Sequence, residues 1–224
     1  MSPDPEDADA APRPGRSVSR GAEATLRQVD WWGFPALQKE RDPKGYRAKA
    51  LDDRLRRERT RTEARLLVEA RRLGVRTPLI FDLDLVKHRI VLEELAGPTL
   101  KALLEAHRDS VDPLQAPVRS FGRALGRLHA GGVSHGDLTS SNVLYPDGPS
   151  GPPAFIDLSM GTKGASLEEL GIDLHLVEED LKGLHPEGAA LTETFYEGYS
   201  EGNPTGSKEV RDRAKAIRGR VRYA

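Results

Sequence analysis

The feature that most constrains the fold is a change of hydrophobic pattern close to the middle of the chain. Before Gly97-Pro98, short apolar runs rich in leucine and β-branched residues predict strands. After this dipeptide, apolar residues recur mainly at helical spacing. Because glycine followed by proline interrupts both patterns, we expect Glu93–Thr99 to be a hinge. The sequence therefore predicts an α+β protein with two lobes, the first β-rich and the second mainly helical.

Within the first lobe, the pattern predicts a hairpin, a helix and a second hairpin. Ala24–Glu40 holds two apolar stretches hinged at Gly33, which places Lys39 near the end of a strand. Arg47–Leu73 lacks proline and carries leucines and alanines at helical spacing, so we expect a helix there. The run "LIFDLDLVKHRIVLEEL" follows and predicts another hairpin.

The second lobe is expected to consist of helices interrupted by one short hairpin. A helix over Thr99–Ala106 and a strongly amphipathic one ending before Gly131-Gly132 come first. Two short runs, Val143–Tyr145 and Ala154–Ile156, are joined by the turn-rich "PDGPSGPP". Three further helices account for Ser166–Ala224.

Composition limits the classes of function only weakly. The 34 basic and 35 acidic side chains leave a net charge of −1, so attraction to nucleic acid would have to come from a local cluster. The absence of cysteine and of a long apolar run led us to expect a cytoplasmic protein that does not bind membranes. We expect residues 1–20, which are rich in proline and acidic side chains, to form a disordered tail. The lobes would then comprise residues 21–96 and 97–224.

The most specific chemical signal is "HGDLTSSN", His135–Asn142, a polar loop that follows a helix. Phosphoryl transfer needs one side chain at the attacking oxygen and another at the metal that neutralises the phosphates. Asp137 suits the first role and Asn142 the second. An isolated Asp-x4-Asn is more often an ordinary turn. Here Asp157 ends the next hairpin, where kinases present a metal-binding carboxylate, and the combination favours a kinase.

Two further residues complete the expected catalytic set. Lys39 would hold the α- and β-phosphates of ATP, and Glu63 would pair with this lysine. Glu63 shares a helical face with Leu67 and Ala70, and a buried carboxylate requires a cation. Either residue alone is more often a solvated surface residue, but together they are better explained as an ion pair.

Nearly the whole folded chain resembles the kinase subunit of the KEOPS complex, a family related to the RIO kinases and to the p53-related protein kinase. The matching stretches are "RGAEA", "QKERDPKGYR", "RTRTEARLL", "GVRTP", "HGDLTSSNVLY", "IDLSMG", "DLHLVEEDL", "FYEGY" and "RGRVR". This resemblance implies ATP and Mg²⁺ binding, protein kinase and ATPase activity, and KEOPS partners, including the subunit that makes threonylcarbamoyladenosine in tRNA. The nucleotide-binding residues that we expect are Gly21, Ala22, Glu23, Ala24, Lys39, Glu93, Leu95, Asn142 and Asp157, of which Asn142 and Asp157 bind the metal.

The chain departs from the family at two positions and from conventional kinases at one. Ala48-Lys49 replaces the usual His-Pro, and Ser159 replaces a glycine of the metal loop, where serine resists backbone angles that glycine permits. No activation segment fits between Asp157 and the next helix. Two alternatives remain open: a small-molecule kinase of the aminoglycoside or choline type, and a nucleotide-binding regulatory scaffold with little turnover.

Lys208–Arg222 is a local basic cluster near the end of the chain. Seven cations crowd this stretch although the whole chain is almost neutral. We expect it to contact tRNA, or the partner that binds tRNA; the alternative is a helix whose charges are merely solvated.

Overall fold

A computed structural model describes residues 13–20 and 24–221. They form two compact units. The first comprises Met1–Thr60 and Leu79–Glu94, and the second comprises Arg61–Pro78 and Leu95–Ala224. No helix within the described ranges is both long and apolar enough to cross a membrane.

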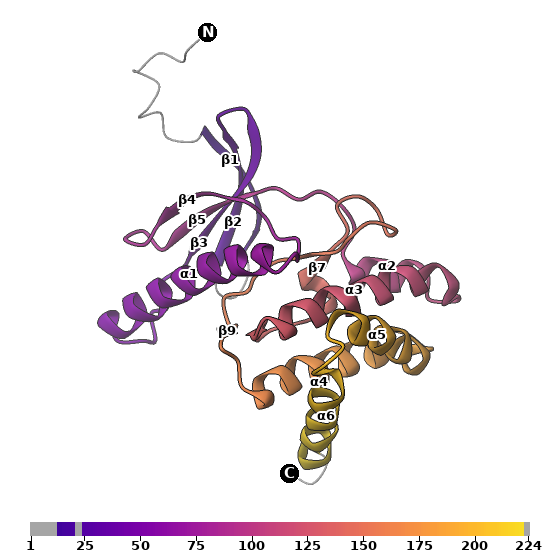
Figure 1. Ribbon diagram of the computed structural model, residues 1–224. Helices are drawn as coiled ribbons and strands as arrows, with labels where there is room; N and C mark the ends of the chain where they lie inside the picture. The colour runs from indigo at the N-terminus through magenta and orange to yellow at the C-terminus, as the bar shows by residue number, and fades with distance from the viewer. Residues whose placement is uncertain (1–12, 21–23, 222–224) are drawn as a thin grey trace. The chain divides into compact units, whose positions relative to one another are not determined.

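The first unit contains a five-stranded antiparallel sheet in the order β1-β2-β3-β5-β4 (Figure 1). Its strands are β1 (Arg13–Arg20), β2 (Ala24–Trp31), β3 (Phe34–Arg41), β4 (Ile80–Asp84) and β5 (Arg89–Glu93). Trp32 and Gly33 both have positive φ and make the tight turn between β2 and β3, as a two-residue hairpin requires. Val29, Ala36 and Val91 form a small core.

Strand β1 corrects the expectation of a disordered tail over residues 13–20. Arg13–Arg20 pairs with β2 at the edge of the sheet, with register shifts after Pro14 and Ser17. Strand pairing uses backbone hydrogen bonds, which a sequence poor in apolar residues can also make. Proline is tolerated at such an edge. Residues 1–12 lie outside the described ranges.

The boundary between the units falls inside helix α1 (Lys49–Arg72). Contacts of its second half and of the following loop explain this division. Lys163 forms an ion pair with Glu69 at 3.0 Å, and the Arg76 carbonyl accepts a hydrogen bond from the Phe155 amide. Residues 61–78 therefore belong with the helical unit, which differs from the expected first lobe of residues 21–96.

The second unit is mainly helical. Its helices are α2 (Leu100–Ala106), α3 (Asp112–Ala130), α4 (Leu167–Leu184), α5 (Gly188–Gly202) and α6 (Ser207–Val221). Short strands pair as β6 (Val133–Ser134) with β9 (Thr162–Lys163), and as β7 (Val143–Leu144) with β8 (Ala154–Phe155). A 3₁₀ turn, η2, covers Ser140–Asn142. In the core of this unit, the Phe121 ring meets Phe155 edge to face and Phe195 at a tilt.

Helices α3 and α5 pack closely because glycines line their contact. A Cβ added at Gly198 of α5 would collide with the Arg119 carbonyl of α3, and one at Gly126 of α3 would collide with the Tyr199 carbonyl. The absence of side chains at these positions lets the two backbones approach. The contact matters because α3 leads directly into β6 and the His135–Asn142 loop.

We expect Gly198→Ala to lower the free energy of unfolding by about 1–3 kcal/mol, since the new methyl group meets backbone rather than a movable side chain. Gly183→Ala is the matched control. It lies in α4 with open space around it and should be neutral or gain up to about 1 kcal/mol in helix propensity. Urea unfolding measures both variants, and equal stabilities would contradict the close helix contact.

Candidate functional site

The His135–Asn142 loop is anchored to the helical unit by one buried carboxylate. Asp173 of α4 is fully buried and accepts hydrogen bonds from the His135 and Gly136 amides, at 2.6 and 2.9 Å. His129 of α3 contacts the same carboxylate through Nε2 at 3.2 Å, and its Nδ1 meets the Tyr199 hydroxyl at 2.9 Å. Asp173 therefore joins the start of the loop to α3 and α4, and His129 extends these contacts to Tyr199 of α5.

Burial alone would raise the pKa of Asp173, but the opposing hydrogen bond and charge interaction with His129, together with His135, hold it below its ordinary value. Asp173 is therefore ionised at neutral pH. The sequence analysis did not select this residue. Its signal was an acidic side chain at helical spacing from Val177 and Leu181, the same kind of signal that singled out Glu63.

The far end of the loop is fixed by separate contacts. Asp180, also on α4, accepts a hydrogen bond from the Ser140 amide at 2.6 Å. Asn142 donates from Nδ2 to the Asp137 carbonyl at 2.8 Å, which directs its amide oxygen away from the loop backbone. The Asp137 side chain is exposed. The loop thus presents a carboxylate and an amide oxygen from a backbone held at both ends.

Asp157 lies beside Asn142 because of the register of β7 and β8. Val143 pairs with Phe155, and the Ile156 amide donates to the Asn142 carbonyl at 3.1 Å. His135 contacts the Ile156 carbonyl through Nε2 at 2.9 Å, which ties the loop to the residue before Asp157. The structure therefore brings Asp137, Asn142 and Asp157 together within one unit.

The metal loop tolerates serine for a reason visible in the backbone. Within the described ranges, the non-glycine residues with positive φ are Trp32, His88 and Asp157, so Asp157 and not Ser159 adopts the left-handed conformation. Aspartate adopts this conformation more readily than most residues. Ser159 is buried, and its hydroxyl donates to Oδ1 of Asp157 at 2.7 Å. The substitution thus adds a hydrogen bond to the carboxylate.

The other expected site residues fall in both units. Lys39 lies on β3 between Leu26 and Ile90, and Glu63 lies on α1, where only 1% of its surface is exposed. Because they belong to different units, their pairing stays a prediction. Ala24 is the first residue of β2, and Leu95 is half-buried. Glu93 is the last residue of β5, and its carboxylate accepts a hydrogen bond from the Leu79 amide at 3.0 Å. Gly21, Ala22 and Glu23 lie outside the described residues.

The oxygens of Asn142 and Asp157 suit a hard divalent cation. Mg²⁺ is usually held by one or two carboxylates together with substrate phosphates. No group of three or more histidine, cysteine, aspartate or glutamate side chains arranged for a metal occurs in the described part of the chain. The two oxygen donors of Asn142 and Asp157 fit a Mg²⁺ ion that also binds the phosphates of a nucleotide.

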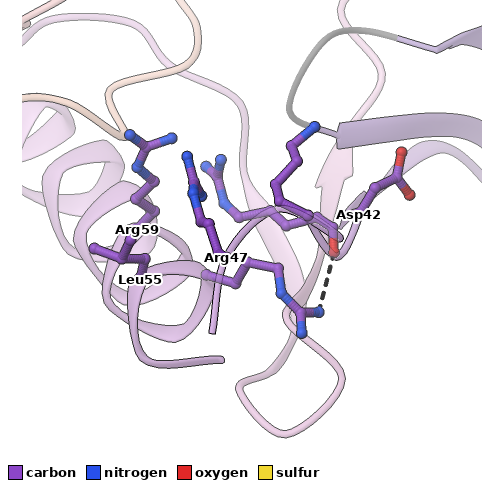
Figure 2. A pocket seen from close by; sticks show the side chains of 7 residues that line it. Asp42, Arg47, Leu55 and Arg59 are labelled. Atoms are coloured by element: carbon purple, nitrogen blue, oxygen red, sulfur yellow. Dashed lines mark hydrogen bonds between the residues drawn. The ribbon is translucent and has the colours of Figure 1, made fainter. Parts of the chain in front are cut away.

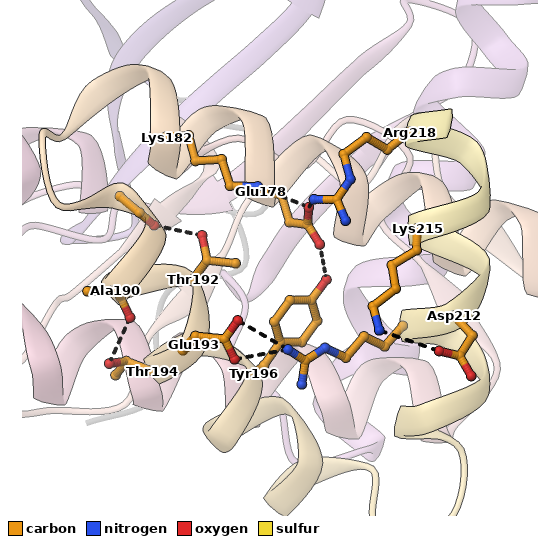
Figure 3. A network of polar contacts seen from close by, with 12 residues as sticks. Glu178, Lys182, Ala190, Thr192, Glu193, Thr194, Tyr196, Asp212, Lys215 and Arg218 are labelled. Atoms are coloured by element: carbon orange, nitrogen blue, oxygen red, sulfur yellow. Dashed lines mark hydrogen bonds and ion pairs between the residues drawn. The ribbon is translucent and has the colours of Figure 1, made fainter. Parts of the chain in front are cut away.

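The basic cluster near the C-terminus is largely occupied by ion pairs. In helix α6, Arg218 contacts the buried Glu178, which also accepts from Lys182 and from the Tyr196 hydroxyl (Figure 3). The remaining pairs are Arg211–Glu193 at 2.9 Å, Arg213–Glu168 at 3.4 Å, Lys215–Asp212 at 3.7 Å and Arg220–Glu168 at 3.1 Å. The Lys215–Asp212 pair lies within α6, and the other pairs attach α6 to α4 and α5. Arg222 lies outside the described residues.

A solved structure and a family of kinases resemble this chain and define its class of protein. Rio2 kinase from Chaetomium thermophilum, solved as an ADP/Mg²⁺-phosphoaspartate complex, superposes with a TM-score of 0.59 at 18% identity, over 94% of this chain and 72% of the other. Residues 43–165 match the lipopolysaccharide kinase (Kdo/WaaP) family. The fold is that of an atypical protein kinase.

Two kinds of relative then fix the family. The KEOPS complex subunit Bud32 of Pyrococcus abyssi is 34% identical over 92% of this chain and 95% of its own length. Probable bifunctional tRNA threonylcarbamoyladenosine biosynthesis proteins of Methanosarcina mazei and Halobacterium salinarum are 38% and 39% identical, over 94% and 92% of this chain. The chain spans 36% of the length of these longer relatives. It belongs to the Bud32 family.

The environment of His135 predicts a dependence of stability on pH. Burial lowers its pKa below 6.5, and the nearby Asp173 opposes this only in part. The unfolded chain then binds the proton more readily, so the histidine's contribution is complete above the unfolded pKa and is lost as the pH falls through the window below 6.5. His88 shifts in the same direction. We expect the free energy of unfolding to fall between about pH 7.5 and 5.5.

His135→Gln, which keeps a donor for the Ile156 carbonyl but does not titrate, should reduce this fall, while His88 maintains the rest. Urea unfolding followed by helical circular dichroism at several pH values provides the measurement. Wild type and variant with the same pH slope would contradict a buried neutral His135.

Proposed function

We propose that this chain is an atypical serine/threonine protein kinase with ATPase activity that works in a KEOPS complex and supports threonylcarbamoyladenosine modification of tRNA. The observation that carries the proposal is the anchored trio of Asp137, Asn142 and Asp157 in a member of the Bud32 family. A relative of similar length is named as a KEOPS complex subunit, which supports a role in such a complex. The proposed partners are the tRNA threonylcarbamoyltransferase subunit and the other KEOPS subunits.

ATP binding would use the residues that the kinase resemblance implies. In this proposal Lys39 holds the α- and β-phosphates and Glu63 holds Lys39. The segment Gly21–Ala24 covers the phosphates, and Glu93 and Leu95 contact the base. Lys39 and Glu63 are each buried, at 8% and 1% exposure, and a buried charge requires a partner of opposite sign, which supports the proposed roles.

At the reacting end, Asp137 would orient the attacking hydroxyl or water and accept its proton. Its exposure allows a substrate to reach it, while the hydrogen bonds at both ends of the loop fix its position. Asn142 and Asp157 would hold Mg²⁺, which neutralises charge on the phosphates when bound. The Ser159 hydroxyl limits rotation of the Asp157 carboxylate.

The short connection between Asp157 and α4 limits the kind of phosphate acceptor that the protein can bind. Only residues 158–166, including β9, separate Asp157 from α4. An extended peptide platform does not fit in so few residues. This favours two kinds of phosphate acceptor at Asp137. One is a hydroxyl group on a folded partner protein. The other is water, in which case the reaction is ATP hydrolysis controlled by the assembly.

Substitution of Asp157 and of Asp137 should separate nucleotide binding from nucleotide turnover. We expect Asp157→Ala to abolish Mg²⁺-dependent nucleotide binding, and Asp137→Ala to keep binding while turnover falls about 100-fold or more. Titration with a fluorescent ATP analogue, with and without EDTA, and an assay of phosphate release would measure the two effects. Unchanged binding and turnover in both variants would refute the site.

Lys39 and Glu63 call for a double-mutant cycle. Each alanine variant should weaken nucleotide binding. The double variant should lose less binding free energy than the sum of the two single losses, by about 1 kcal/mol or more, because either single substitution already removes the ion pair. Binding constants for the four proteins give the coupling energy. Simple additivity would mean that Glu63 is a structural residue of α1.

A further inference from the structure

One face of helix α1 carries a row of arginines that has no role in the proposed catalysis. Arg57, Arg61 and Arg65 are exposed and follow one another at intervals of four residues. Because α1 is a continuous helix, this spacing places them on the same face, with about 6 Å of helix axis between neighbours. These three residues are called the arginine stripe below. Leu55 and Arg59 lie on another side of α1, where they line a small hollow against the loop after β3 (Figure 2).

Within residues 13–20 and 24–221, the guanidinium groups of the arginine stripe form no ion pair and no hydrogen bond. The nearby acids of α1 have other surroundings. Glu58 contacts Arg54 at 3.9 Å, and Glu69 contacts Lys163 at 3.0 Å. Glu63 is buried. The basic side chains of α6 differ from the stripe, because five of them form ion pairs.

Such a row of cations is unfavourable for the helix by itself. Like charges at positions i and i+4 lie side by side on a helix and destabilise it. An acid at the middle position would turn this repulsion into attraction, as Glu58 does for Arg54. The arginine stripe keeps the repulsion instead. An anion outside the chain that contacts several of the arginines at once would relieve it.

The surroundings of the stripe indicate the chemistry of this anion. The centre of a protein–protein interface is usually apolar or aromatic and poor in charge. On α1, the exposed large apolar residues are Leu51, before the stripe, and Val68, after it. Phosphate is a good partner for arginine, because one guanidinium group can donate two hydrogen bonds to it. A single phosphate cannot reach three arginines spread over about 12 Å of helix, whereas a nucleic acid offers phosphates in a row.

We propose that the arginine stripe contacts the phosphate backbone of RNA. This inference rests on the proposed role in tRNA modification, which makes RNA the polyanion that the chain meets. The stripe is better suited to this contact than the C-terminal cluster, because its guanidinium groups do not have to give up an ion pair first. Contacts of this kind position the RNA without reading its sequence.

The test compares Arg57→Gln/Arg61→Gln/Arg65→Gln, the stripe variant, with the control Arg213→Gln/Lys215→Gln/Arg220→Gln. The control removes the same charge from paired cations of α6. Binding of fluorescent tRNA to the full chain is measured by anisotropy between about 50 and 200 mM salt. The stripe variant should bind at least about tenfold more weakly, with a salt slope shallower by about 2, because three phosphate contacts no longer release counterions. The control should bind tRNA as wild type does.

Four other results would overturn the inference. Equal losses in both variants would mean a diffuse effect of charge, and a loss in the control alone would place the contact on α6. Wild type that binds no tRNA would leave the stripe without its ligand. If the stripe variant binds tRNA normally but no longer binds poly-L-glutamate, the stripe contacts an acidic protein instead of RNA.

Two further measurements keep the test decisive. Glutamine has nearly the helix propensity of arginine and removes the repulsion, so the melting temperature of the stripe variant should not fall. Should that variant fail to fold, Arg61→Gln alone must make the salt slope shallower by about 0.7–0.9. Mg²⁺-dependent ATP binding and turnover are measured in every protein. Their absence from wild type would refute the proposed kinase function, whereas normal tRNA binding by a stripe variant that still binds ATP would refute only the stripe.

Discussion

The arrangement of the site depends on the buried carboxylate of Asp173. An ionised group in a protein interior is costly unless its hydrogen bonds are satisfied, and Asp173 meets two backbone amides and one imidazole. Those amides belong to His135 and Gly136, immediately before Asp137. The cost of leaving the carboxylate without partners therefore enforces the position of the loop. Helix α4, which follows Asp157 in the sequence, thus fixes the His135–Asn142 loop, which precedes Asp157.

Further hydrogen bonds connect this anchor to the end of the hairpin at Asp157, part of the proposed metal site. His135 uses its amide for Asp173 and its ring for the Ile156 carbonyl, so it couples the two halves of the proposed metal site. Ser159 then holds one oxygen of Asp157. Beneath them, the glycine contact between α3 and α5 lets His129 and Tyr199 reach each other and complete the chain of hydrogen bonds. Preorganisation of this kind costs no rearrangement when substrate binds.

Much of the fold was predictable because local rules suffice for it. The hairpin at Gly33, the helices of the second half and the short hairpin before Asp157 all follow from periodicity and turn chemistry. Features set by distant partners were not predictable. Asp173 accepts hydrogen bonds from residues 37 and 38 positions away, and β1 is held by backbone pairing. Arg211 and Arg213 of α6 are paired with acids on α5 and α4. By contrast, the side chains drawn in Figure 2 all come from residues 41–59, where the end of β3, the following loop and the start of α1 succeed one another in the sequence.

The central claim is that the loop at Asp137 and the hairpin end at Asp157 form one Mg²⁺-dependent nucleotide site. Hydrogen exchange of the full chain, with ATP and Mg²⁺ and with ATP and EDTA, tests it directly. We expect slower exchange of amides in residues 135–145 and 155–161 only when both ATP and Mg²⁺ are present, with α5 and α6 unchanged. Exchange in those two segments that is the same with and without Mg²⁺ would contradict it.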